Sequence, residues 1–181
     1  MRHSGKIISG AVMTILLAGL PLSGCSGTAE PEMLDYSGGA AVGMPNPFTS
    51  YQSVAEGERV VGFPVNRNFV PPASWQGRAP LVQVLDSYPD RKKMLQLIYV
   101  DAEKRNLYVR YSKQFTSREM NGDYNEYPVE KDIPLNGDTA HIRGTKEGFF
   151  TAEFSCRGIA ITVLSDLPLQ GKDIAGICSG M

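Results

Sequence analysis

Alternation of hydrophobic and polar residues predicts that the second half of the chain is built from strands. In the segment 107–111 every second residue is apolar, as in a half-buried strand. Similar runs predict six strands, over residues 81–88, 94–100, 107–112, 139–143, 149–154 and 159–165. In the fifth run this pattern places Phe150, Ala152 and Phe154 on the core face. The runs are separated by short turn sequences, which indicates a mainly antiparallel sheet.

Two short helices are expected to flank the strands. Ser53 and Glu56 have the spacing of a capping box, and Gly62 and Pro64 end the helix that follows them. Residues 170–178 carry apolar side chains at helical spacing and form the expected closing helix. The expected fold is therefore α+β, with a mainly antiparallel sheet of five to six strands and both short helices, N-terminal and C-terminal, packed on one face.

The N-terminus is typical of a secretory signal. Arg2 and Lys6 precede an uncharged stretch, residues 7–22, which is shorter than the roughly 20 apolar residues of a membrane-spanning helix. The next residues, Leu22-Ser23-Gly24-Cys25, resemble the lipobox of bacterial lipoproteins. This resemblance implies cleavage after residue 24 and a lipid on Cys25. An ordinary signal followed by an unmodified cysteine is the alternative.

The lipobox resemblance divides the chain into three expected parts. Residues 1–24 form the signal peptide, residues 25–47 form a flexible linker rich in Gly, Ser and Pro, and residues 48–181 form one domain. Acyl chains on Cys25, palmitate among them, anchor a protein to a bilayer. We therefore expect a protein anchored at the cell membrane on the extracytoplasmic side, or at the outer membrane of a cell that has two membranes.

Charge argues against a nucleic-acid partner. The chain has 18 Lys and Arg residues against 19 Asp and Glu residues, and its formal net charge is −1. A protein that holds a phosphate backbone needs a basic surface. We therefore expect no nucleic-acid partner.

Cys156 and Cys178 are expected to pair. The chain has three cysteines, and a lipid on Cys25 would leave these two. An even number of cysteines in an exported chain is typical of disulfides, and this bridge would fasten the closing helix to the sheet. Two buried free thiols are the alternative. The long spacing between the cysteines differs from the Cys-x-x-Cys pattern of redox catalysts.

Five short segments resemble the family called domain of unknown function 4367. They are Val60-Val61-Gly62-Phe63-Pro64-Val65, Asn121-Gly122-Asp123-Tyr124-Asn125, Thr151-Ala152-Glu153-Phe154, Pro168-Leu169 and Asp173-Ile174-Ala175. Such domains occur in lipoproteins and in the outer parts of membrane proteins. The resemblance therefore implies an exported domain and no particular reaction.

Few residues point to catalysis or metal binding. His141 is the only histidine after the signal, and a lone histidine makes a poor metal site. We expect it to be a half-exposed strand residue. Asn121-Gly122-Asp123 and Asn136-Gly137-Asp138 are turn sequences, with a calcium loop as the alternative. Ser179-Gly180 lacks the strand–turn–helix context of a nucleophile. We therefore expect no catalytic, metal or cofactor site and no enzyme activity.

One binding surface is indicated by the tyrosines. Tyr108, Tyr124 and Tyr127, together with Arg110, are expected to form an aromatic and cationic patch on the sheet face that the helices leave open. Scattered exposed side chains are the alternative.

The expected function is that of a lipid-anchored, non-enzymatic domain that binds or senses a component of the cell envelope, such as an envelope protein. One alternative is a lipid or lipoprotein carrier with an apolar cavity. A second alternative is an envelope hydrolase that uses His141.

Overall fold

The computed structural model of the chain describes residues 46–87, 90–135, 137–179 and 181. The expected signal peptide, Cys25 and nearly all of the expected linker lie outside the described residues. The chain divides after Gly39, and the unit Ala40–Met181 contains every element given below.

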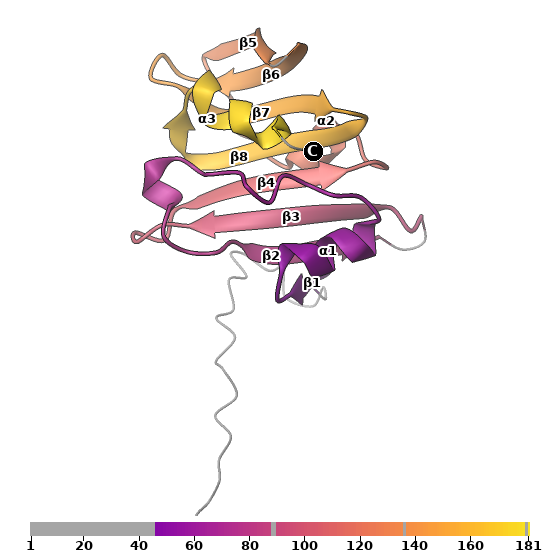
Figure 1. Cartoon of the computed structure of the whole chain (residues 1–181). Coiled ribbons are helices and arrows are strands. Elements are labelled where there is room, and N and C mark those ends of the chain that lie inside the picture. Colours follow the sequence, from indigo (N-terminus) through magenta and orange to yellow (C-terminus); the bar gives the residue numbers. More distant parts are fainter. Residues whose placement is uncertain (1–45, 88–89, 136, 180) are drawn as a thin grey trace, which may run out of the picture. The chain divides into compact units, whose positions relative to one another are not determined.

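One antiparallel sheet of eight strands forms the centre of this unit (Figure 1). Its strands are β1 (Phe48–Tyr51), β2 (Leu81–Asp86), β3 (Lys93–Val100), β4 (Asn106–Ser112), β5 (Val129–Leu135), β6 (Asp138–Gly144), β7 (Phe149–Cys156) and β8 (Ile159–Leu169). They lie in the order β1-β2-β3-β4-β8-β7-β6-β5, and every neighbouring pair is antiparallel. Two meanders of four strands therefore meet where β4 pairs with β8.

Short helices lie on both faces of the sheet. They are α1 (Val54–Val61), α2 (Ser117–Asn121) and α3 (Gly171–Ala175), with the 3-10 turns η1 (Ala73–Trp75) and η2 (Gly176–Cys178). A Cβ on Gly57 of α1 would meet the Leu95 and Val82 side chains, whereas Ser117 of α2 binds Thr162 of β8. Neighbouring residues of a strand point to opposite faces, and Thr162 is next to the core residue Val163. Helix α2 therefore lies on the face opposite α1.

The face under α1, named the core face here, is apolar. Directly paired side chains cross six strands on this face: Val82, Leu97, Val109, Val163, Ala152 and Ile142. The segment after α1 covers them with Phe63, Phe69 and Trp75, and η2 adds Ile177, all of which are buried. Burying a large apolar side chain stabilises a fold by about 1.5–3 kcal/mol. This layer is therefore the main source of the domain's stability.

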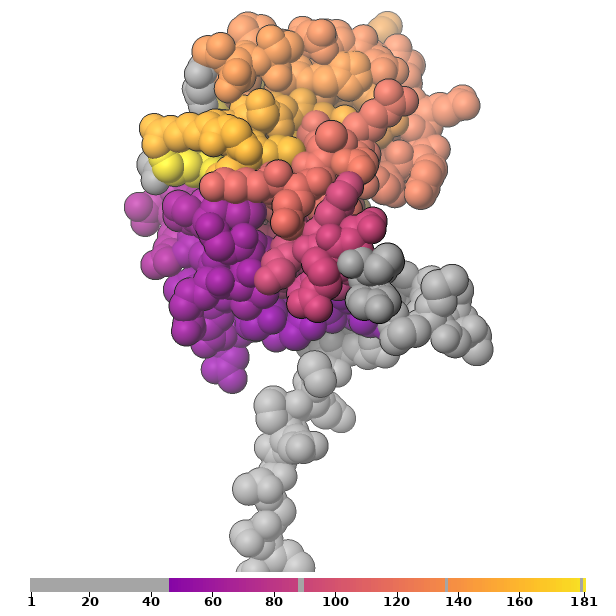
Figure 2. All heavy atoms as spheres, turned by 90° about the vertical axis from the view of Figure 1, so that its right-hand side faces the viewer, coloured from indigo at the N-terminus to yellow at the C-terminus, as the bar shows by residue number. Residues whose placement is uncertain are grey.

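Figure 2 shows the domain from one end of its strands. Purple atoms of the N-terminal part and yellow atoms of the C-terminal end gather on the left, and the segment that follows β4 gathers toward the right. The opposite face of the sheet, named the α2 face here, carries this second segment.

The expected N-terminal helix is confirmed as α1. The Ser53 hydroxyl accepts a hydrogen bond from the Glu56 amide at 3.3 Å, and Gly62 ends the helix in the left-handed conformation, with φ of 80°. All six predicted strands are also present, with small changes at their ends.

The predicted fold class is wrong in the number of strands and in the placement of the helices. The sheet has eight strands, not five to six, and its helices are small and lie on both faces. Strand β1 was missed because Thr49 and Gln52 also have the spacing of a capping box. Strand β5 was missed because Lys131 and Pro134 interrupt its alternation. Both are edge strands, where charge and proline are tolerated.

Candidate functional site

A row of polar side chains crosses all eight strands on the α2 face. Its members, each paired in register with the next, are Ser50, Gln83, Gln96, Arg110, Thr162, Glu153, His141 and Asp132. This polar row on the α2 face lies opposite the apolar row that crosses the core face. The α2 face is therefore the side of the sheet that offers polar chemistry.

Arg110 fastens α2 to this row. Its Nε donates to the Gln96 side chain at 2.7 Å, and its Nη1 donates to the carbonyl oxygens of Met120 at 2.5 Å and Asn121 at 3.0 Å. These carbonyls stand at the end of α2, where a helix leaves its acceptors unpaired. Burial lowers the pKa of the Arg110 guanidinium. Arg110 is thus half-buried and engaged with the protein.

Two further bonds hold α2 to the second meander. The Thr162 hydroxyl donates to the Ser117 carbonyl at 2.6 Å, and the Asn121 amide donates to Glu153 of β7. Helix α2 is therefore tied to β4, β8 and β7 at once, and the loop that follows it starts from a fixed position.

The expected aromatic and cationic patch does not form one exposed surface, because α2 covers part of this face. The face on which we placed the patch is covered, and Arg110 points to α2 and Gln96 instead of solvent. Tyr124 alone stands in solvent, with 94% of its surface exposed. Tyr108 and Tyr127 instead line a pocket, so the tyrosines do not form one flat surface.

This pocket, named the Tyr108 pocket here, lies between the loop after α2 and the strands β4, β7 and β8. Its volume is about 190 Å³. The lining residues are Tyr108, Gly122, Asp123, Asn125, Tyr127, Phe150, Leu164, Ser165 and Asp166. Aromatic rings and hydrogen-bonding groups thus converge from segments far apart in the sequence.

The loop wall of the pocket is held by Asp123. Its carboxylate accepts hydrogen bonds from the Asn125 amide at 3.0 Å and from the Tyr127 hydroxyl at 2.9 Å. Arg143 of β6 donates to the Asp123 carbonyl at 3.3 Å and lies over the Tyr127 ring. The positive φ of 67° at Gly122 turns the chain from α2 into this loop. The Asn121-Gly122-Asp123 turn is therefore a helix end that builds a pocket wall.

An irregularity in pairing builds the opposite wall. Phe149 pairs with Leu169 but Thr151 pairs with Leu164, so one residue of β7 faces four of β8. Bulges redirect side chains, and here Phe150 lies on the α2 face, where it stacks on Tyr127 with centroids 5.6 Å apart. The expectation that Phe150 faces the core is wrong for this reason.

The same irregularity places Asp166 beside the pocket. Its Oδ2 accepts hydrogen bonds from the backbone and side-chain amides of Asn106, at 2.6 Å and 3.2 Å. Asp166 and Pro168 follow a largely apolar stretch of β8, and they are the signal in the sequence that would have indicated the bulge. Phe150 and Asp166 are the site residues that sequence reasoning missed.

Two polar groups of the pocket remain available. Within the described part of the chain, neither the Tyr108 hydroxyl nor the second carboxylate oxygen of Asp166 has a hydrogen-bond partner. Burial, and then the negative charge of Asp166, raise the pKa of Tyr108. Tyr108 is therefore neutral at physiological pH and able to donate.

His141 lies on β6 and does not line this pocket. Its Nδ1 is 2.8 Å from Asp132 and its Nε2 is 2.9 Å from Glu130. The hydrogen bond to Asp132 is the main cause of the raised pKa of His141, and Glu130 adds to it. The side chain is 40% exposed. Carboxylates do lie within hydrogen-bond distance of His141, but both ring nitrogens are engaged with them.

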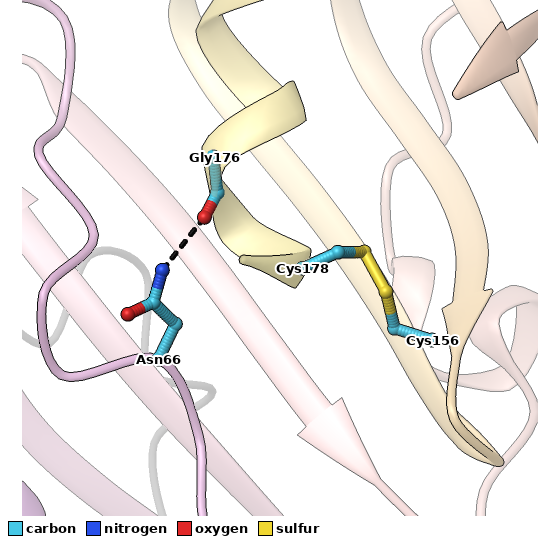
Figure 3. The surroundings of a disulfide bond; sticks show 4 residues. All are labelled: Asn66, Cys156, Gly176 and Cys178. Atoms are coloured by element: carbon cyan, nitrogen blue, oxygen red, sulfur yellow. Dashed lines mark hydrogen bonds between the residues drawn. A yellow bond between two sulfur atoms is a disulfide. The ribbon is translucent and has the colours of Figure 1, made fainter. Parts of the chain in front are cut away.

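Cys156 and Cys178 form a disulfide in the structure, with Cα atoms 6.0 Å apart (Figure 3). The bridge joins the end of β7 to η2. Beside it, the Asn66 amide donates to the Gly176 carbonyl at 2.7 Å. The C-terminal segment is thereby fixed on the core face from two sides.

A second pocket of about 260 Å³ lies near the start of α3. Its walls include Lys131, Lys146 and Phe149 with the backbone of Gly144 and Gly148. Phe149 is a buried core residue, so this pocket offers no free aromatic face. It holds fewer converging polar groups than the Tyr108 pocket.

In residues 46–181 as described, no cluster of three His, Cys, Asp or Glu side chains is placed to hold a metal ion. Asn136 of the second predicted turn and Gly180 of the Ser179-Gly180 pair lie outside the described residues. No helix in the described ranges has the length and apolar character needed to cross a membrane.

No family model, curated protein or solved structure matches this chain.

Proposed function

We propose that this protein is a lipid-anchored, extracytoplasmic binding module, without enzyme activity, whose ligand occupies the Tyr108 pocket. The observation that carries the binding role is the convergence of Tyr108, Tyr127 and Phe150 with unpaired polar groups in one pocket. Rigid elements that present aromatic rings and a few oriented polar groups are typical of binding sites.

The extracytoplasmic placement rests on the N-terminal sequence. The signal-like residues 1–24 and the lipobox at Cys25 support export and acylation. A disulfide between Cys156 and Cys178 suits an oxidising compartment.

The position of His141 supports binding over hydrolysis. A general base needs a free nitrogen facing a nucleophile, and both nitrogens of His141 face carboxylates. The pockets described above hold 260 and 190 Å³, below the range of about 300–1,000 Å³ typical of sites that enclose a drug-sized ligand. Neither pocket favours a carrier of acyl chains.

Metabolic labelling tests the anchoring. The full-length chain is expressed in a bacterium supplied with an alkyne-tagged fatty acid, with Cys25→Ser as the control. We expect label and membrane-bound protein for the wild-type chain and neither for the variant. Wild-type protein that carries no label, or that retains residues 1–24, would contradict the proposed anchoring.

A further inference from the structure

The lining of the Tyr108 pocket narrows the chemistry of its ligand, and this step rests on the proposed function. We infer that the pocket binds a single uncharged sugar residue, stacked on Phe150 and Tyr108 and donating hydroxyl hydrogen bonds to Asp166.

Anionic ligands are excluded by the charges of the lining. Asp123 and Asp166 both face the pocket. The nearby guanidinium groups are engaged elsewhere. Arg110 binds Gln96 and the end of α2, and Arg143 binds Thr151 and Asp123. Arg105, which interacts electrostatically with Asp166, binds Asp101 and Glu103. A phosphate or carboxylate would therefore meet like charge without a free cation to offset it.

Cationic ligands are disfavoured by the same guanidinium groups. Arg110 lies 5.7 Å from the Tyr108 ring centre, and Arg143 lies 5.8 Å from the Tyr127 ring centre. Two of the three rings that line the pocket, Tyr108 and Tyr127, thus already have a cation beside them. A neutral ligand meets no electrostatic penalty here.

The remaining groups suit a ligand that is apolar on one side and rich in hydroxyl groups. Phe150, Tyr108 and Leu164 supply apolar surface, and the C–H face of a sugar ring packs on such surfaces. The available oxygen of Asp166 accepts hydrogen bonds, and the Tyr108 hydroxyl donates or accepts them. A volume of about 190 Å³ suits one ring better than a larger ligand, because sites for drug-sized molecules start near 300 Å³.

The test uses the lipidated protein, purified in a detergent without sugar groups. Calorimetry and saturation-transfer NMR measure the binding of four neutral trisaccharides, which are the trimers of glucose, galactose, mannose and N-acetylglucosamine. A galacturonate trimer is the anionic ligand and spermidine is the cationic ligand. We expect at least one neutral trimer to bind, with an affinity unchanged between low and high salt because no net charge is involved. Galacturonate and spermidine should not bind.

Two variants locate the site. Phe150→Leu keeps apolar volume but removes the ring. It should lower the affinity for the trimer about tenfold, which corresponds to the loss of one aromatic contact. Tyr124→Ala is the control. Tyr124 belongs to the loop after α2, which forms one wall of the pocket, but its side chain is 94% exposed and does not line the pocket. Its affinity should equal that of the wild type, and circular dichroism checks that both variants are folded.

Three outcomes overturn the inference. They are binding of none of the neutral trimers, binding that Phe150→Leu leaves unchanged, and binding of spermidine that salt weakens. If spermidine binds and Phe150→Leu abolishes that binding, the pocket is a binding site, but its ligand is an amine and not a sugar. Fatty-acid labelling of Cys25 is unaffected by any of these results, so failure of the sugar inference and failure of the proposed anchoring are told apart.

Discussion

The Tyr111 hydroxyl is a polar group placed in the centre of an apolar core. The Tyr111 side chain on β4 is fully buried, and in the part of the chain that the structure describes its hydroxyl has no hydrogen-bond partner. Burial raises the pKa of Tyr111, so the group stays neutral. A buried polar group without a partner loses about 1–3 kcal/mol relative to its hydrated state.

Removal of this hydroxyl is predicted to stabilise the domain. Tyr111→Phe keeps the ring and should raise the free energy of unfolding by about 1 kcal/mol, measured by urea denaturation. Tyr51→Phe, at a partly buried position, is the control and should change little. A loss of stability in Tyr111→Phe would show that the hydroxyl is hydrogen-bonded after all.

His141 is predicted to titrate above the ordinary histidine value, because Asp132 and Glu130 stabilise its cation. Since the folded-state pKa is raised, its contribution to stability is complete below about pH 6.5. That contribution is lost as pH rises through the folded-state pKa. The imidazole NMR signals give the pKa directly, because the chain has no other histidine beyond the expected signal. Asp132→Asn should lower this pKa, and an unchanged value would contradict the assignment.

At the scale of elements, α2 depends on side chains of the sheet more than on its own length. It has five residues, too few for an isolated helix to be stable. A capping box formed by Thr116 and Glu119 begins it, and Arg110 pairs its last carbonyls. Its position, and with it one wall of the Tyr108 pocket, therefore follows from a residue of β4.

Replacement of Arg110 is predicted to loosen α2. Arg110→Met leaves the Met120 and Asn121 carbonyls without their donor and should lower the free energy of unfolding by about 2 kcal/mol. Hydrogen exchange of the amides in 117–127 should also become faster. Arg78→Met, at an exposed position, is the control. Equal losses in the two variants would argue against the role of Arg110.

The disulfide is predicted to stabilise the C-terminal segment. It closes a loop with a sequence separation of 22 residues, and a loop of that size corresponds to about 3 kcal/mol in the chain-entropy account. The double variant Cys156→Ala/Cys178→Ala should lose about that amount, measured by urea denaturation. Wild-type protein treated with reductant should match it. A larger loss in the variant than in the reduced protein would mean that packing of the sulfur atoms contributes as well.

The sequence predicts the inner strands and α1 because their signals are local. Period-two alternation marks β4 and a capping box marks α1, and both patterns lie within a few residues. The edge strands were not predicted, because a strand paired on one side tolerates Lys131 and Pro134. The pocket was not predicted, because Phe150 and Asp166 reach it through a shift of register between β7 and β8, and register is set by the partner strand. Tyr108 and Tyr127 were predicted as residues of a binding surface on an open sheet face, but beside α2 and its loop they line a pocket instead.

At the scale of the whole molecule, all the described elements belong to the unit that starts at Ala40. The expected anchor and most of the expected linker precede it. We expect residues 25–47 to act as a linker, and a domain joined to its anchor by a linker folds without the residues that precede it.

A chain that begins at residue 46 is therefore predicted to fold independently. Its thermal midpoint should agree with that of the lipidated protein within about 2 °C, which corresponds to under 1 kcal/mol for a domain of this size. Differential scanning calorimetry of both proteins checks this. A midpoint that falls by many degrees would show that the residues before 46 contribute to stability.

The seam between β4 and β8 also affects how the domain forms as the chain emerges on the far side of the membrane, where we propose that it folds. Leu107 pairs with Ser165, so β1 to β4 emerge well before β8, the second partner of β4. Pairings between distant segments form slowly, and an unpaired strand edge recruits other chains. Until β8 arrives, β4 exposes such an edge to neighbouring unfolded chains. Holdase chaperones of that compartment should therefore raise the yield of native protein by shielding this edge.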